Sequence, residues 1–201
     1  MDIESVKTNF VKRGFNFDYF ENCQDAIKYV ISLIPKKSSI GFGGSVSVIE
    51  SGLFDALKSD DYTLLHRTTC PNIEKEDLYQ KMHLANWYIC SSNALSKTGE
   101  LINIDGRANR LGEVINGPTN ILFFCGINKL VDNISDGIDR VRNVASPKNC
   151  VKLNKKTPCA ITGKCSYCNS IDTICKATVI LHHPTTGRNV YIILVNKNLG
   201  F

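Results

Sequence analysis

The amino-acid sequence predicts an α/β fold built on an open, mainly parallel β-sheet. Short apolar runs of strand length alternate with helical patterns along the first 145 residues, and this order is typical of parallel strands joined by helices. The alternation stops over residues 147–176, which hold four of the nine cysteines. Two β-branched runs then follow, and we expect them to form a closing hairpin that adds an antiparallel edge to the sheet.

Local signals place the individual elements along the chain. Residues 18–34 put Ala26, Val30 and Ile34 on one side of a helix, and Pro35 ends it because proline lacks the backbone N–H that a helix interior needs. The predicted strands are residues 38–44 (running into a glycine turn), 62–66, 87–95, 101–104, 120–126, 176–183 and 189–196. The further predicted helices are residues 47–59, 74–84 and 131–145, the last of them ended by Pro147.

Length and composition are those of one globular domain. The chain has 201 residues, of which 43% are hydrophobic and 21% charged, so we expect a single α/β domain over residues 1–201, with 147–176 as a cysteine-rich, metal-binding insertion. No apolar run reaches about 18 residues, which argues against a membrane span. The charged N-terminal residues do not resemble a secretory signal, and nine cysteines cannot all pair within one chain. We therefore expect a cytoplasmic protein with reduced thiols.

Charge is distributed unevenly along the chain. Residues 140–201 carry ten Lys or Arg and one acid, a balance of +9, whereas residues 1–139 carry 14 basic and 18 acidic residues, a balance of −4. Cations stabilise thiolate-bound clusters, which carry net negative charge; the simpler alternative is a solvated, lysine-rich surface. No helix-turn-helix pattern, aromatic RNA-binding motif or basic helix accompanies the positive charge, so nucleic-acid binding is not indicated.

The cysteines of residues 158–175 predict a metal site. Cys159, Cys165, Cys168 and Cys175 follow the spacing C-x5-C-x2-C-x6-C. A 4Fe–4S cluster accepts varied spacing around one C-x2-C pair, and it is the cofactor we expect. Zinc is the alternative, although structural zinc sites favour two such pairs, and free or redox-paired thiols are a third reading. The remaining cysteines read as buried free thiols, with Cys70 or Cys150 as possible spare ligands.

A glycine-serine segment at residues 40–51 predicts an anion site. A strand that ends in glycines and opens into a helix presents backbone N–H groups to an anion, and serine hydroxyls add donors. The candidate ligand-binding residues are Gly43, Gly44, Ser45 and Ser47. The alternative is a tight turn that needs glycine for backbone freedom. Glu50 lies one helical turn later; it is a candidate catalytic carboxylate or, alternatively, a surface or capping acid.

Residues 91–120 form a polar, loop-rich stretch between predicted strands. Loops at strand ends are where α/β folds place their ligands. Asp105, followed by glycine, is a candidate catalytic acid or base, with a plain turn as the alternative. The candidate ligand-binding residues here are Asn93, Asn109 and Arg110. Lys129, Arg140 and Arg142 are further candidates for anion binding, with a surface cation as the alternative reading.

Several long motifs resemble one known family. The segments GFGGSVSVIESGL, SSNALSKTGELINIDGRANR, GPTNILFFCGINKLV, RVRNVASPKN, PCAITGKCSYCNS and LVNKNLGF are similar, in this order, to short LUD-domain proteins, relatives of the lactate-utilisation protein LutC and the YkgG proteins. The resemblance covers nearly the whole chain. It implies a fold similar to the NagB/RpiA/CoA-transferase group, whose sugar-phosphate isomerases bind phosphate in a glycine-serine loop and carry acid/base groups on a D-G segment.

The same resemblance suggests a metabolic setting. LutC belongs to a system that oxidises lactate to pyruvate alongside iron–sulfur subunits, although LutC-type members typically lack such a cysteine cluster. Our first hypothesis is a redox or cluster-assisted enzyme that binds a 4Fe–4S cluster and a small anionic substrate in a cleft at the strand ends, with an electron-transfer partner. One alternative is a non-redox isomerase or acyl-transfer enzyme with structural zinc. Another is an accessory protein that binds a metabolite.

Overall fold

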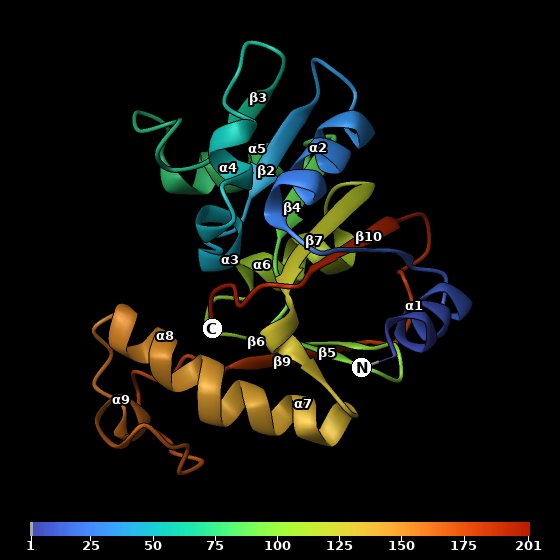
Figure 1. The fold of residues 1–201 in the computed structure, drawn as a ribbon. Helices are drawn as coiled ribbons and strands as arrows, with labels where there is room; N and C mark the ends of the chain where they lie inside the picture. Colours follow the sequence, from blue (N-terminus) through green and yellow to red (C-terminus); the bar gives the residue numbers. More distant parts are fainter. Residues whose placement is uncertain (1) are drawn as a thin grey trace.

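The computed structural model describes residues 2–201 and confirms an α/β fold with an open, mainly parallel sheet. Six strands form the main sheet in the order β1-β10-β7-β4-β2-β3, and every neighbouring pair is parallel. These strands are β1 (Asn16–Phe20), β2 (Ser39–Phe42), β3 (Thr63–Leu65), β4 (Trp87–Cys90), β7 (Asn120–Gly126) and β10 (Asn189–Val195). In Figure 1, helices lie on both sides of this sheet, as parallel strands require.

Helices connect the strands. They are α1 (Ile3–Lys12), α2 (Cys23–Leu33), α3 (Val46–Glu50), α4 (Leu53–Ala56), α5 (Lys75–His83), α6 (Asn109–Asn116), α7 (Ile134–Arg140), α8 (Ser146–Lys152) and α9 (Pro158–Thr162), with a short 3-10 turn η1 (Ile127–Lys129). The helix predicted from residue 18 begins later, at Cys23. Asn22 caps it by accepting a hydrogen bond from the Asp25 N–H, so the aromatic residues before this cap are free to form β1.

The two last strands do not form the predicted closing hairpin. β9 (Ala177–Leu181) pairs antiparallel with β6 (Leu101–Asp105), whereas β10 enters the main sheet between β1 and β7. β10 is apolar on both faces, as a buried parallel strand must be. β9 instead completes a second sheet of order β8-β5-β6-β9, with β5 at Ala94–Ser96 and β8 at Leu130–Val131.

A single long helical segment runs past the proline that was expected to end it. Helix α7 continues through a π-helical turn, η2 (Val141–Ala145), into α8, where Pro147 occupies the first turn. A π turn widens the helix locally, and it stands directly before Pro147, which cannot donate the backbone hydrogen bond of a helix interior. Figure 1 shows α7 and α8 lying along the second sheet, with α9 beside α8. The predicted insertion at 147–176 is therefore partly helical.

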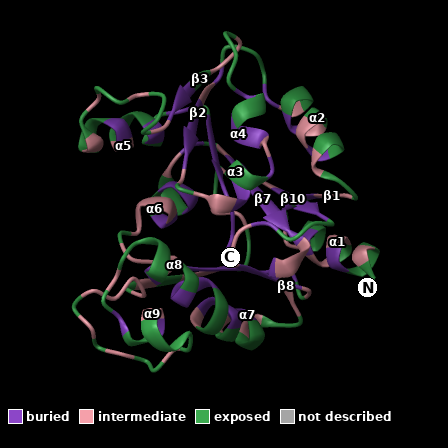
Figure 2. Cartoon of the chain, turned by 60° about the vertical axis from the view of Figure 1, so that its left-hand side comes forward, coloured by how far each residue is buried: buried purple, intermediate pink, exposed green. Residues whose placement is uncertain are grey.

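Apolar side chains fill both faces of the main sheet. One cluster joins this sheet to α2, α3 and α4, and a second joins its other face to α1, α6 and the second sheet. A third packs Ala94 and Ile102 of the second sheet against Val141 and Ala145 of the long helix. Figure 2 shows the resulting buried centre, with exposed residues on the outer helices. Within residues 2–201, no helix has the length and apolar character needed to cross a membrane.

Candidate functional site

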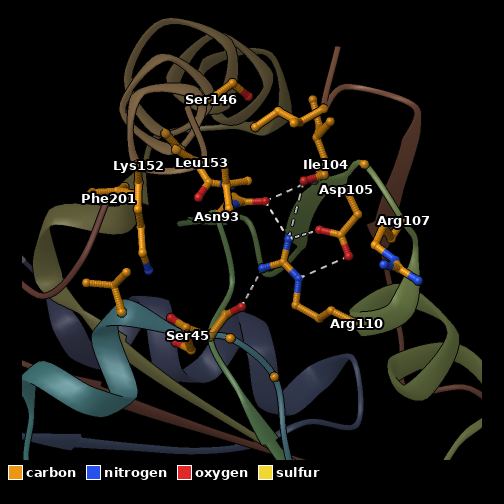
Figure 3. Close-up of a pocket in the computed structure, with 18 of the residues that line it drawn as sticks. Ser45, Asn93, Ile104, Asp105, Arg107, Arg110, Ser146, Lys152, Leu153 and Phe201 are labelled. Atoms are coloured by element: carbon orange, nitrogen blue, oxygen red, sulfur yellow. Dashed lines mark hydrogen bonds and ion pairs between the residues drawn. The ribbon is translucent and has the colours of Figure 1, made fainter. Parts of the chain in front are cut away.

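A cleft of about 510 Å³ lies at the carboxyl ends of β2, β4 and β6, with α8 forming its opposite wall (Figure 3). It is bounded by the loop after β2, by residues 91–93, by residues 104–110 and by residues 145–155. Ligands of open α/β sheets bind at this end of the strands. Its charged lining side chains are Arg107, Arg110, Lys129, Lys152, Lys155, Lys176 and the carboxylate of Asp105. The cleft therefore carries a strongly positive lining.

The cleft brings together most of the residues that the sequence singled out. Its lining includes Gly43, Gly44, Ser45, Ser47, Asn93, Asp105, Asn109, Arg110 and Lys129. Glu50 does not belong to the lining. It is exposed at the end of α3, and its Oε2 accepts a hydrogen bond of 2.6 Å from the Gly200 N–H. Glu50 thus contacts the backbone near the end of the described chain and does not face the cleft.

The two glycines after β2 have different steric surroundings. A Cβ on Gly43 lies 2.8 Å from the hydroxyl oxygen of Tyr88, a side chain that is itself buried. A Cβ on Gly44 meets no protein atom within 4 Å. Gly43 is therefore required by close packing of the loop on β4, whereas Gly44 leaves space next to the cleft.

This difference predicts opposite results for two matched substitutions. We expect Gly43→Ala to lower the melting temperature by several degrees, because the new methyl group collides with the hydroxyl group of the buried Tyr88 side chain. Gly44→Ala should keep the melting temperature within about 2 °C of the wild type. Thermal unfolding followed by circular dichroism compares the two variants. Equal losses of stability in both would contradict the steric assignment.

Arg110 and Asp105 form a buried ion pair at the end of β6. The Arg110 Nη2 lies 2.5 Å from Asp105 Oδ1, and the Leu111 N–H donates to the other carboxylate oxygen. Burial alone would lower the pKa of Arg110, but the adjacent Asp105 carboxylate outweighs it and raises the pKa. Arg110 also donates to the Ser91 carbonyl oxygen and to Asn93 Oδ1, as the dashed lines in Figure 3 show. The pair thus ties two loops of the cleft together.

Lys129 is a buried cation among neutral groups. It ends η1, directly after β7, and is only 4% exposed. Its three N–H donors bind Ser47 Oγ at 2.8 Å, Ser91 Oγ at 3.0 Å and the Ser92 carbonyl oxygen at 3.0 Å. Burial lowers the pKa of Lys129 to about 8, with smaller contributions in the same direction from the positive charges of Arg140 and Arg110. The positive charge in this part of the cleft is thus solvated by neutral oxygen atoms.

Some cleft residues were not predicted. Ser91 and Ser92 directly follow β4, so the position of serines at a strand end was a usable signal. Ser146 and Lys152 come from α8, and only the three-dimensional path of the long helix brings them to the cleft. Arg140, which the sequence offered for anion binding, instead donates to the carbonyl oxygens of Asn128 and Asn93.

A second, much smaller cavity gathers five cysteines. It measures about 20 Å³, the space of one water molecule, and its lining includes Cys150, Cys159, Cys165, Cys168 and Cys175. The four cysteines of the predicted metal site thus surround one space. Throughout residues 2–201 all cysteines are free thiols, and no group of three His, Cys, Asp or Glu side chains is arranged to hold a metal ion.

The donor set of this cavity fits a thiolate-bound group. Sulfur ligands dominate it, the Arg142 guanidinium donates to Cys165 Sγ at 3.8 Å, and the Tyr167 N–H donates to the same sulfur at 3.4 Å. Hydrogen bonds and cations of this kind stabilise thiolates on iron or zinc. Admitting a cluster requires the loop that carries Cys165 and Cys168 to move outward.

The two cavities share a wall. Ser146 and Thr173 line both of them. Cys175 Sγ lies 3.5 Å from the hydroxyl oxygen of Ser146, so one side chain separates a thiol of the cysteine cavity from the positively charged cleft. A group held by these cysteines would therefore lie next to a molecule bound in the cleft.

The fold and this cleft define an α/β protein with a cationic cleft at the carboxyl ends of its strands. The family model of the LUD domain matches residues 3–195, and the chain belongs to this family. A solved structure of a DUF162 family protein from Deinococcus radiodurans has a similar fold, with a TM-score of 0.56 at 13% identity; the match covers 96% of this chain and 95% of that one. No curated protein matches the chain.

Proposed function

We propose that this LUD-domain protein binds a small anionic metabolite in the cleft and a 4Fe–4S cluster in the adjoining cysteine cavity, and that it is a redox or cluster-assisted enzyme of small-molecule metabolism. The observation that carries the proposal is the shared wall of Ser146 and Thr173 between a cationic cleft and a cavity lined by five thiols. Free thiols persist in the reducing cytoplasm, which is where we place the protein.

The cleft supports an anionic ligand of small size. Six cationic side chains and a single carboxylate side chain line it, and that carboxylate already pairs with Arg110. A volume of about 510 Å³ suits a small molecule. Lys129 supplies the buried positive charge, while Arg110 positions Ser91 and Asn93 through the hydrogen bonds that occupy its guanidinium. The resemblance to lactate-utilisation proteins makes lactate and pyruvate the first anions to test, beside inorganic phosphate.

The cysteines supply the ligands of the second group. The proposed ligands of the cluster are Cys159, Cys165, Cys168 and Cys175. Arg142, which donates a hydrogen bond to Cys165, would offset the negative charge of the cluster. When bound, such a cluster supplies one-electron transfer or, if one of these four cysteines is not a ligand and an iron is left open, Lewis-acid activation of a substrate oxygen. Electron transfer further requires a partner protein, and the basic segment 140–201 would favour an acidic one.

Metal analysis tests the proposal directly. We expect protein purified without oxygen to contain about four irons and four acid-labile sulfides per chain and to absorb broadly near about 400 nm. The double variant Cys165→Ser/Cys168→Ser should lose both elements, whereas Cys23→Ser, which changes a cysteine outside the cavity, should retain them. Wild-type protein without iron and sulfide would contradict the cluster.

One observation favours a second candidate. Cys150 Sγ and Cys159 Sγ are 3.8 Å apart, and two thiolates on one tetrahedral zinc have about this separation, because zinc–sulfur bonds are about 2.3 Å long. The protein would then be a non-redox isomerase or acyl-transfer enzyme, or a metabolite-binding accessory protein, with structural zinc. One zinc per chain without sulfide in the same analysis would support this candidate.

A further inference from the structure

Cys150 belongs to the cysteine cavity although it lies outside residues 158–175, which carry the other four thiols. It is on α8, is 1% exposed, and lines the same cavity. Its sulfur lies 3.8 Å from that of Cys159. Cys159 is fixed in turn by α9, where its sulfur is 3.3 Å from the hydroxyl oxygen of Thr157. Two helices therefore hold this pair of thiols together.

The sulfur–sulfur distance constrains how the pair can bind a cluster. In a 4Fe–4S cluster held by four cysteines, each iron takes one thiolate. Thiolates on different irons are kept apart by a whole edge of the cluster, whereas two sulfurs around the same metal position are about 3.8 Å apart when metal–sulfur bonds are about 2.3 Å long and tetrahedral. Cys150 and Cys159 are thus too close together to bind two different irons of one cluster.

We propose that Cys150 and Cys159 are alternative ligands of one iron, and that Cys165, Cys168 and Cys175 hold the other three. The inference rests on the proposed 4Fe–4S cluster and adds a residue to its ligand set. While one thiolate of the pair binds, the other remains a thiol at hydrogen-bond distance from it. In an exchange, the incoming thiol gives its proton to the departing thiolate, so that one iron–sulfur bond replaces another and the charge is unchanged.

Serine variants of the five cysteines, purified without oxygen and analysed for iron and sulfide, test the proposal. We expect Cys150→Ser and Cys159→Ser each to keep more than half of the wild-type iron and sulfide. The double variant Cys150→Ser/Cys159→Ser should keep less than a tenth, as should Cys165→Ser, Cys168→Ser and Cys175→Ser singly. Loss of the cluster in either Cys150→Ser or Cys159→Ser alone would overturn the shared position, and so would its retention in the double variant.

Two controls separate this inference from the proposed function and from misfolding. Wild-type protein without iron and sulfide would overturn both proposals. Wild-type protein that contains the cluster, together with a Cys159→Ser variant that lacks it, would overturn only the proposal that Cys150 and Cys159 share one iron. Because Cys150 is buried, a hydroxyl there costs stability, so Cys150→Ala and Cys159→Ala accompany the serine variants. The far-ultraviolet circular dichroism of each variant should equal that of Cys23→Ser, whose thiol is outside the cavity.

Discussion

Replacing Lys129 with methionine is expected to weaken the binding of a small anion about 100-fold. The Lys129 ammonium is buried, and its three hydrogen bonds go to neutral oxygen atoms. An anion in the cleft therefore interacts with a charge that water screens little. A loss of about 2.7 kcal/mol of binding free energy, roughly that of two unit charges about 6 Å apart at an effective dielectric constant of about 20, corresponds to this factor. Calorimetric titration with pyruvate and with inorganic phosphate measures it.

The same residue predicts how binding depends on pH. With a pKa of about 8, Lys129 is mostly charged at pH 7 and about nine-tenths neutral at pH 9, so the affinity for pyruvate, whose own charge does not change in this range, should fall about tenfold between these values. Lys129→Met should lack this dependence of affinity on pH.

Stability should also depend on pH through Lys129. The pKa of Lys129 is lower in the folded state than in the unfolded chain, so the unfolded state binds more protons between about pH 8 and 10.5. Wild-type stability should consequently rise with pH over this window, and the variant should lack the rise.

A lysine elsewhere in the cleft provides the matched control. Lys152 lines the cleft from α8 but is exposed, so water screens its charge and Lys152→Met should reduce anion affinity only a few-fold. Equal losses in Lys152→Met and Lys129→Met would mean that the net positive charge of the cleft, and not the buried ammonium, attracts the ligand.

The sequence carried enough information for the sheet but not for the position of every strand in it. Buried parallel strands are apolar on both faces, and residues 120–126 and 189–195 show that pattern in the structure. The hairpin prediction was wrong because a turn-rich link between two β-branched runs does not specify which strands they pair with. β10 pairs with residues 69 and 175 positions earlier, and no local pattern encodes such partners.

The cleft was largely predictable for a related reason. Parallel strands present their carboxyl ends at one edge, so polar residues that follow different strands, such as Ser45 and Asn93, converge there. Helix-borne residues were harder to place. Glu50 was chosen for its spacing from the serines, yet it lies on an exposed part of α3. Cys150 reaches the cysteine cavity only because α8 continues past Pro147, against the usual effect of proline.

Replacing Asp105 with alanine is expected to destabilise the protein by about 3 kcal/mol. The side chains of Asp105 and Arg110 are only 13% and 16% exposed, so the substitution leaves a mostly buried guanidinium without its counter-charge. It also removes the acceptor for the Leu111 N–H in the first turn of α6. For a chain of this length, the loss corresponds to a melting temperature lower by about 9 °C. Thermal unfolding of the variant measures it.

The double variant Asp105→Ala/Arg110→Met separates the ion pair from other roles of the carboxylate. Removing both charges should restore part of the lost stability, because no unpaired guanidinium then remains in the interior.

Asp105→Asn keeps the hydrogen-bond acceptor and should lose less stability than Asp105→Ala. If Asp105 acted as the acid or base that the sequence suggested, Asp105→Asn would abolish turnover while anion binding and stability changed little. If the ion pair instead positions the two loops, anion binding and stability should decrease together, and the variant with the largest loss of stability should bind the anion most weakly.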